Sequence, residues 1–151
     1  MKNEYHAIGL MSGTSLDGLD IAFVIFKLND KQEVDFTIQK TKTIEYSDDL
    51  IQKLSSSHMM KAEDFLLFHN AFGEFLGKKV QEFIKKNELT IDFVASHGHT
   101  IFHQPQHKFT FQIGNGATIC AKTKITTISD FRSLDVALLG NGAPLVPIGD
   151  L

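Results

Sequence analysis

The chain has 151 residues, the length of one ordinary domain, and its 42% hydrophobic and 22% charged residues are typical of soluble globular proteins. A formal net charge of −3 excludes a general electrostatic affinity for nucleic acid. The single cysteine, Cys120, excludes a disulfide framework and favours a reducing compartment. Because no apolar run reaches the length of a membrane span, we expect a cytoplasmic protein with neither a membrane nor a nucleic-acid partner.

The first third of the chain is predicted to form three antiparallel strands. Apolar runs at residues 6–10 and 19–26 flank a turn rich in glycine and hydroxyl side chains, and residues 34–39 alternate apolar and polar side chains. A short helix should follow from Ser47, its candidate N-cap, and end at the serines of 55–57. This order predicts that strands precede the first helices.

A long amphipathic helix is predicted from about Lys61 to about Asn87. Apolar side chains, mostly phenylalanines, recur there at steps of three and four residues, which is the pattern of a helix packed on a core. Asn87 is the candidate left-handed C-cap. Gly73 and Gly77 each cost about 1 kcal/mol relative to alanine within a helix. We therefore expect another backbone to pack closely against that face.

Strands and helices are predicted to alternate in the remainder of the chain. The expected elements are strands at 91–95, 109–112 and 125–128 and a helix at 117–122. Together with the first strands they predict the α/β class, with a mixed sheet of three leading antiparallel strands and flanking helices. Polar loops are expected directly after the strands.

The turn between the first two strands has the composition of a phosphate-binding loop. Gly13 can adopt a positive φ and present backbone N–H groups, and the hydroxyls of Ser12, Thr14 and Ser15 can donate to phosphate oxygens. Asp17 beside such a loop suggests Mg²⁺ between carboxylate and phosphate. The missing Gly-Lys-Ser/Thr ending excludes a Walker-type loop. A hairpin turn without a ligand is the alternative.

Two polar segments after predicted strands are candidate substrate loops. Residues 96–100 contain His97 and His99, whose spacing favours hydrogen bonding to a polar substrate over zinc ligation, although the imidazoles could also only brace the loop. Asp130 could accept a substrate hydroxyl, and Arg132 could hold a carboxylate or phosphate. A structural pair between Asp130 and Arg132 is the alternative. The sequence does not rank the two histidines.

Five ordered segments together resemble the motifs of the anhydro-N-acetylmuramic acid kinase family. They are LMSGTSLDGLD at 10–20, SHGHTI at 96–101, FQIGN at 111–115, DFR at 130–132 and GNGAPLVP at 140–147. The resemblance covers nearly the whole chain. Five motifs in the same order are far more specific than any single one.

The resemblance implies an actin-like, sugar-kinase ATPase fold built from ribonuclease-H-like domains. Residues 1–151 would form the N-terminal domain of a two-domain kinase, and the second domain would be absent. The implied reaction, in peptidoglycan recycling, converts 1,6-anhydro-N-acetylmuramic acid to N-acetylmuramic acid 6-phosphate, with ATP and Mg²⁺ as cofactors and hydrolytic opening of the anhydro ring. The implied ATP-binding segment comprises Ser12, Gly13, Thr14, Ser15, Leu16, Asp17, Gly18 and Leu19.

The resemblance also implies roles for other residues. Related sugar kinases carry an aspartate where Met11 stands, so the metal contact is expected from Asp17, with Asp20 as the other nearby candidate. The implied sugar contacts are His97, Asp130 and Arg132. The family's catalytic base is expected beyond Leu151, so no residue receives that role and the isolated chain is expected to be inactive.

The expected partner is a small-molecule sugar, and a homodimer is one assembly open to the full-length enzyme. Two other functions remain open at this point. The chain could be a non-catalytic module that binds phosphate or sugar, or it could belong to an actin- or chaperone-like ATPase. Sugar-dependent consumption of ATP would distinguish the kinase from both.

Overall fold

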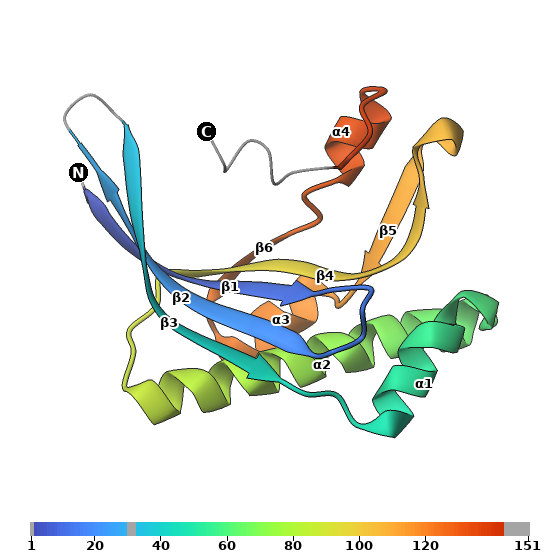
Figure 1. Ribbon diagram of the computed structural model, residues 1–151, viewed down its shortest axis with the longest axis horizontal. Coiled ribbons are helices and arrows are strands. Elements are labelled where there is room, and N and C mark those ends of the chain that lie inside the picture. Colours follow the sequence, from blue (N-terminus) through green and yellow to red (C-terminus); the bar gives the residue numbers. More distant parts are fainter. Residues whose placement is uncertain (1, 30–32, 144–151) are drawn as a thin grey trace.

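The computed structural model describes residues 2–29 and 33–143 of the chain (Figure 1). The described strands are β1 (Glu4–Ser12), β2 (Leu19–Leu28), β3 (Val34–Ile44), β4 (Phe93–Gln104), β5 (Phe109–Ile113) and β6 (Thr126–Ser129). The described helices are α1 (Asp48–Ser56), α2 (Ala62–Asn87), α3 (Gly116–Thr123) and α4 (Ser133–Ala137), with 3₁₀ turns at Ser57–Met59 and Pro105–His107. These bounds confirm most of the elements that the sequence predicts.

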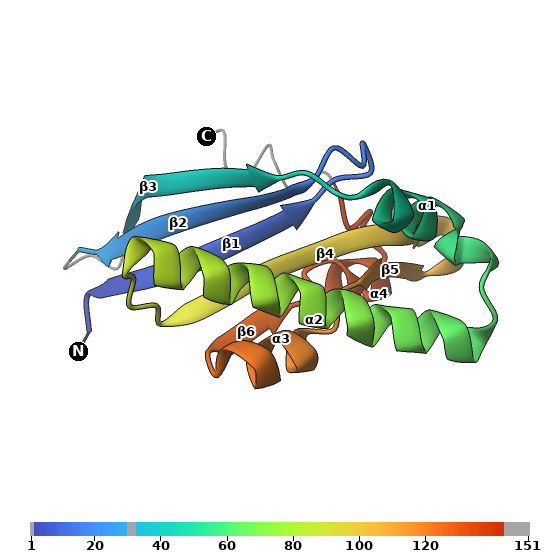
Figure 2. The same cartoon turned by 90° about the horizontal axis from the view of Figure 1, so that it is seen from below.

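The described strands form one mixed six-stranded sheet with α1, α2 and α3 on the same face (Figures 1 and 2). Its order is β3-β2-β1-β4-β5, and β6 also pairs with β4. β1 is antiparallel to β2, and β2 is antiparallel to β3. β4 is parallel to both β1 and β6 but antiparallel to β5. The predicted α/β class, with three leading antiparallel strands, is confirmed.

Several local predictions about loops and helix ends are wrong. Residues 96–100, predicted as a loop, lie inside β4, because β1 and then β5 supply hydrogen-bonding partners as the strand continues. The chain after β6 forms the short helix α4 where only a loop was expected. The serines of 55–57 do not stop the helical path at once, since α1 includes two of them and the third opens a 3₁₀ turn.

The hydrophobic core lies between the sheet and α2. The apolar stripe of α2 is confirmed as core, and its most buried members are Phe68, Phe72, Leu76, Val80 and Phe83. They pack with inward-facing strand residues such as Ile8, Ile21 and Val94. Although α2 has 26 residues, none of the described helices combines the length and apolar character that a membrane span requires.

The two glycines of α2 mark the contact with α3, as predicted. A Cβ on Gly73 would lie 2.8 Å from the backbone oxygen of Asn115, and one on Gly77 would lie 2.8 Å from Cβ of Lys122. The helix ends differently from the prediction. Glu88, with φ 53°, is the left-handed cap, whereas Asn87 is the last helical residue.

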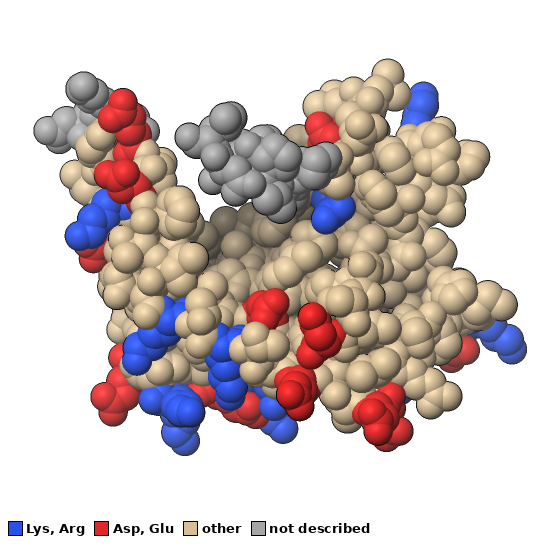
Figure 3. Space-filling model, in the orientation of Figure 1, with Lys and Arg blue, Asp and Glu red and all other residues tan. Residues whose placement is uncertain are grey.

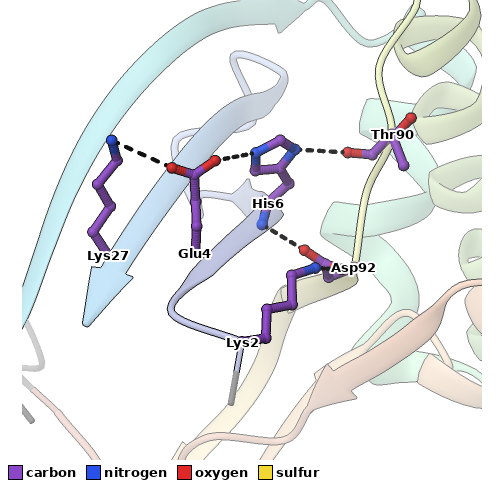
Figure 4. Close-up of polar contacts among 6 residues, drawn as sticks. All are labelled: Lys2, Glu4, His6, Lys27, Thr90 and Asp92. Atoms are coloured by element: carbon purple, nitrogen blue, oxygen red, sulfur yellow. Dashed lines mark hydrogen bonds and ion pairs between the residues drawn. The ribbon is translucent and has the colours of Figure 1, made fainter. Parts of the chain in front are cut away.

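A polar cluster fastens the start of β1 to the segment before β4 (Figure 4). The His6 ring bridges the Glu4 carboxylate and the Thr90 carbonyl, each at 3.1 Å, and the His6 backbone N–H donates to Asp92 at 2.7 Å. Lys2 also contacts Asp92, and this ammonium together with the His6 N–H lowers the pKa of the carboxyl. The cluster lies at the beginning of β1, at the opposite end of the strand from the turn between β1 and β2.

Candidate functional site

The connection between β1 and β2 is a tight turn whose polar side chains face solvent. The Leu16 N–H donates to the Gly13 carbonyl at 3.2 Å, and the Ser15 hydroxyl donates to Asp17 at 2.8 Å. The side chains of Thr14, Ser15 and Asp17 are exposed. Two hydroxyls and one carboxylate of the predicted phosphate loop are therefore accessible to a ligand.

The backbone of this loop departs from the predicted conformation at one residue. Gly13 does not take the positive φ that was expected of it; the positive values in the loop are at Leu16, with φ 61°, and Gly18, with φ 151°. A Cβ on Gly18 would lie 2.5 Å from the carbonyl oxygen of Ile44. Only glycine suits this position, because the end of the loop runs directly beside the end of β3.

Ser12, at the entry to the loop, is held from below by two buried side chains. Its side chain is 2% exposed, and its Oγ accepts from the Tyr46 hydroxyl at 2.6 Å and lies 2.9 Å from Nδ1 of His99. Since Oγ accepts from tyrosine, its own proton can be donated to the imidazole. Burial raises the pKa of Tyr46 to about 12 and lowers the pKa of His99, so both stay uncharged at neutral pH.

The predicted substrate residues His97 and Arg132 meet in the structure. Nε of Arg132 donates to Nε2 of His97 at 2.9 Å, and Nδ1 of His97 donates to the Gly98 carbonyl at 3.0 Å. Both ring nitrogens therefore have partners. Burial, with a smaller contribution from the Arg132 charge, lowers the pKa of His97. This ring positions the guanidinium and has no free nitrogen to act as a base.

Asp130 occupies a special backbone position immediately after β6. Its φ is 62°, and its carboxylate accepts a hydrogen bond from the Ser133 hydroxyl at the start of α4. In the described part of the chain Asp130 forms no ion pair with Arg132, whose Nε donates to His97 instead. The structural Asp–Arg pair considered from sequence is therefore wrong.

Strand register explains why these distant segments share one edge of the sheet. Leu10 of β1 is opposite Ser96 of β4, and Ser96 is opposite Ser129 of β6. The three strands are parallel, so the loop after β1 and the segment after β6 leave from the same edge, next to His97. In α/β sheets this is the edge at which ligands usually bind.

A hollow of about 640 Å³ lies on the sheet face turned away from α2, and we call it the open-face hollow. Its lining includes Met11, Asp20, Thr43, His97 and Phe131. Asp20, which accepts from the Thr43 hydroxyl, faces this hollow, whereas Asp17 does not line it. The side of the molecule in Figure 3 is concave between the β2–β3 end and α4, and its rim carries charges of both signs.

A second cavity of about 280 Å³ opens where β5 and β6 diverge from β4, and we call it the fork pocket. Its lining includes His69, Ser96, Phe111, Gln112 and Asp130. Sequence reasoning missed His69, because it lies within the phenylalanine stripe of α2. It also gave no role to Gln112, although this residue belongs to one of the five motifs. For His69, a polar residue inside an otherwise apolar stripe was the available signal.

Metal-binding groups do not converge within residues 2–29 and 33–143. Three or more His, Cys, Asp or Glu side chains do not come together there in a way that could hold a metal ion. The loop region instead has the separate carboxylates of Asp17 and Asp20. This set fits Mg²⁺, which commonly takes only one or two protein carboxylates and completes its shell with phosphate oxygens and water.

The fold and this edge of the sheet define an α/β domain of the actin-like, sugar-kinase ATPase class. The family model for anhydro-N-acetylmuramic acid kinase matches residues 5–150. The chain therefore belongs to the anhydro-N-acetylmuramic acid kinase family.

Curated relatives agree with this assignment. A protein named anhydro-N-acetylmuramic acid kinase from Pseudoalteromonas translucida is 40% identical over 95% of this chain and 39% of its own length. Relatives of the same name from Mannheimia succiniciproducens and Caldanaerobacter subterraneus are each 39% identical over 97% of this chain and 40% of their own length. The chain thus spans about two fifths of the length of these relatives.

Proposed function

We propose that the complete protein is an ATP-dependent kinase acting on 1,6-anhydro-N-acetylmuramic acid in cytoplasmic peptidoglycan recycling. It would form N-acetylmuramic acid 6-phosphate while water opens the anhydro ring. The observation that carries this proposal is the meeting of the β1–β2 loop with His97 and Arg132 at one edge of the sheet, in a chain of this family. Phosphoryl transfer depends mainly on positioning and charge neutralisation, which such an arrangement can supply.

The β1–β2 loop is the proposed ATP site. Thr14 and Ser15 offer exposed hydroxyls, and the tight turn between Gly13 and Leu16 places backbone N–H groups near them. Ser12 would support the loop from the protein interior, because its hydroxyl is buried between Tyr46 and His99. The proposed ATP-binding segment is Ser12, Gly13, Thr14, Ser15, Leu16, Asp17, Gly18 and Leu19.

Mg²⁺ would be held near the phosphates by Asp17, with Asp20 as the alternative carboxylate. Bound there, the ion would neutralise charge on the phosphate oxygens. Asp17 is oriented by the Ser15 hydroxyl, and Asp20 by the Thr43 hydroxyl. Each carboxylate keeps an oxygen beyond these two hydrogen bonds for further coordination.

The sugar would contact His97, Asp130 and Arg132. Arg132 is the only one of the three with a positive charge, and its Nε is fixed by His97, so its terminal nitrogens can face a carboxylate. Muramic acid carries such a carboxylate. Asp130 would accept a hydrogen bond from a hydroxyl or amide of the sugar. A homodimer of the complete protein remains part of the proposal.

The decisive assay measures ATP consumption with and without the anhydro sugar. The kinase predicts sugar-dependent consumption and a phosphorylated sugar product from the complete protein. Binding without turnover would indicate a non-catalytic module, and hydrolysis stimulated by peptide or polymerisation would indicate the actin- or chaperone-like class. We expect the 151-residue chain alone to bind without forming product.

Asp17→Asn tests the proposed metal contact. Its amide keeps the size of the side chain but removes the charge, so turnover of the complete enzyme should fall at least tenfold, or about 1.4 kcal/mol of transition-state stabilisation. Asp35→Asn is the matched control, because Asp35 is an exposed carboxylate on β3. Unchanged steady-state rates for Asp17→Asn would refute the role of this carboxylate.

A further inference from the structure

The fork pocket contains a buried hydroxyl without a hydrogen-bond partner. Ser96 is 1% exposed, and its Oγ is the only buried side-chain nitrogen or oxygen atom in the described part of the chain that lacks such a partner. Burying an unpaired hydroxyl costs free energy, so nearly all such groups in proteins are satisfied. Because Ser96 lines the fork pocket, a ligand entering the pocket could supply its missing partner.

A second group in the same pocket is a histidine that offers a proton. The Gly114 N–H donates to Nδ1 of His69 at 3.2 Å, so the neutral ring must carry its hydrogen on Nε2. Burial lowers the pKa of His69, which keeps the ring neutral at pH 7. In the described part of the chain Nε2 has no hydrogen-bond partner. The pocket therefore offers two neutral donors, this N–H and the Ser96 hydroxyl.

Acceptors and an aromatic ring complete the lining. Gln112 donates its amide nitrogen to Thr110 at 2.8 Å, which leaves its carbonyl oxygen available, and Asp130 uses one carboxylate oxygen for Ser133. Phe111 adds an apolar wall and packs against His69 with ring centroids 5.3 Å apart. Donors, acceptors and an apolar surface thus lie within one small cavity.

The charge of the pocket disfavours an anionic ligand. Its described lining includes the carboxylate of Asp130 and neither lysine nor arginine. The N–H groups of Ala117 and Thr118 in the first turn of α3 are not free, since Oδ1 of Asn115 accepts from them at 2.8 Å and 3.2 Å, respectively. We therefore expect phosphates and carboxylates to bind outside the fork pocket, near Arg132. A neutral group with both a donor and an acceptor fits inside.

We propose that the fork pocket binds the acylamino group of the amino-sugar substrate. The acyl C=O accepts from the Ser96 hydroxyl and from Nε2 of His69. Its N–H donates to Gln112 or Asp130, and its methyl group contacts the Phe111 ring. This inference rests on the proposed function, and it assigns the specificity for an N-acylated sugar to residues outside the phosphate loop.

The test compares two ligands that differ in the proposed group. 1,6-Anhydro-N-acetylglucosamine carries the acylamino group, and 1,6-anhydroglucose carries a hydroxyl in its place. Each sugar is titrated into the complete protein, and binding is monitored by calorimetry and by the NMR signals of the His69 ring. The N-acetylated sugar should bind about fivefold to tenfold more tightly, as expected for one or two neutral hydrogen bonds.

Ser96→Ala should remove most of this preference without destabilising the protein, because it deletes a hydroxyl that has no partner in the free state. Ser57→Ala is the matched control, since Ser57 is also 1% exposed but donates to the Leu54 carbonyl. This control should lower stability and keep the preference. A reduced thermal stability of Ser96→Ala with an unchanged preference would show a structural role and overturn the inference.

The outcome is separable from that of the kinase proposal. If ATP is consumed with the anhydro sugar but the two ligands bind equally, the kinase stands and the pocket assignment fails. If the N-acetylated sugar binds preferentially through Ser96 but no phosphorylated product forms, the pocket assignment stands and the kinase proposal fails. His69 signals that do not respond to saturating N-acetylated sugar would also overturn the assignment.

Discussion

The buried hydrogen bond between Tyr46 and Ser12 gives a prediction that can be worked out from the structure. Tyr46→Phe removes the hydroxyl that donates to Oγ of Ser12 at 2.6 Å. Tyr46 is 8% exposed and Ser12 is 2% exposed, so water cannot readily replace the lost donor. The phenylalanine ring should keep the contacts with Phe72 and Phe75, whose ring centroids lie 6.3 and 6.0 Å away. The change therefore isolates one polar interaction.

The expected loss is about 1–2 kcal/mol in the free energy of unfolding. A neutral hydrogen bond contributes about 1 kcal/mol net, and leaving a buried acceptor with fewer partners raises the cost. Because Ser12 keeps His99 as a hydrogen-bond partner, the loss of stability should be smaller than for a buried group left without any partner. Because Ser12 is the residue at the start of the proposed phosphate loop, we also expect weaker binding of a non-hydrolysable ATP analogue.

Urea unfolding followed by circular dichroism measures the stability change. Tyr5→Phe is the matched control: it is the other of the two tyrosines in the chain, and its hydroxyl has no hydrogen-bond partner within the described residues. A double-mutant cycle with Ser12→Ala should show that the two losses are not additive, since both variants remove the same bond. The reasoning is refuted if Tyr46→Phe and Tyr5→Phe unfold at the same urea concentration.

Two further predictions concern packing and pH. Gly73→Ala should destabilise the protein by about 1–3 kcal/mol despite the higher helix propensity of alanine, because the new Cβ would lie 2.8 Å from the Asn115 oxygen; an unchanged urea midpoint would contradict this close approach. Burial lowers the pKa of His69, His97 and His99, so the unfolded state binds protons more readily. Their contribution to stability should be complete above about pH 6.5 and decline below it. Urea unfolding at pH 7.5 and 5.5 tests this direction, and equal midpoints would count against it.

Local periodicity was sufficient to predict most of the elements. The apolar repeat of α2 and the alternation in β3 reflect side-chain directions that follow from backbone geometry alone. The extension of β4 through residues 96–100 was not predictable in this way, because its sequence is polar and its strand conformation depends on hydrogen bonds to β1 and β5. Partners distant in sequence leave no local pattern.

The candidate site could likewise be predicted only in part from the sequence. The composition of the β1–β2 loop indicated a phosphate site, and the five ordered motifs indicated the family that the comparisons confirm. Sequence could not pair Arg132 with His97, which lies 35 positions earlier, and considered Asp130 as its structural partner instead. It also could not show that the Ser12 hydroxyl lies between Tyr46 and His99.

The sequence by itself determined most of the segments that become helices and strands, and which family the chain resembles, because both depend on residue types at fixed spacing along the chain. Only the tertiary structure decided which polar groups are already paired and which are free. Hydrogen-bond satisfaction is a property of neighbours in space. The parallel register of β1, β4 and β6 brings the loop ends together, whereas Tyr46 and His99 pack around the Ser12 hydroxyl, and the Ser96 hydroxyl has no partner among the described residues.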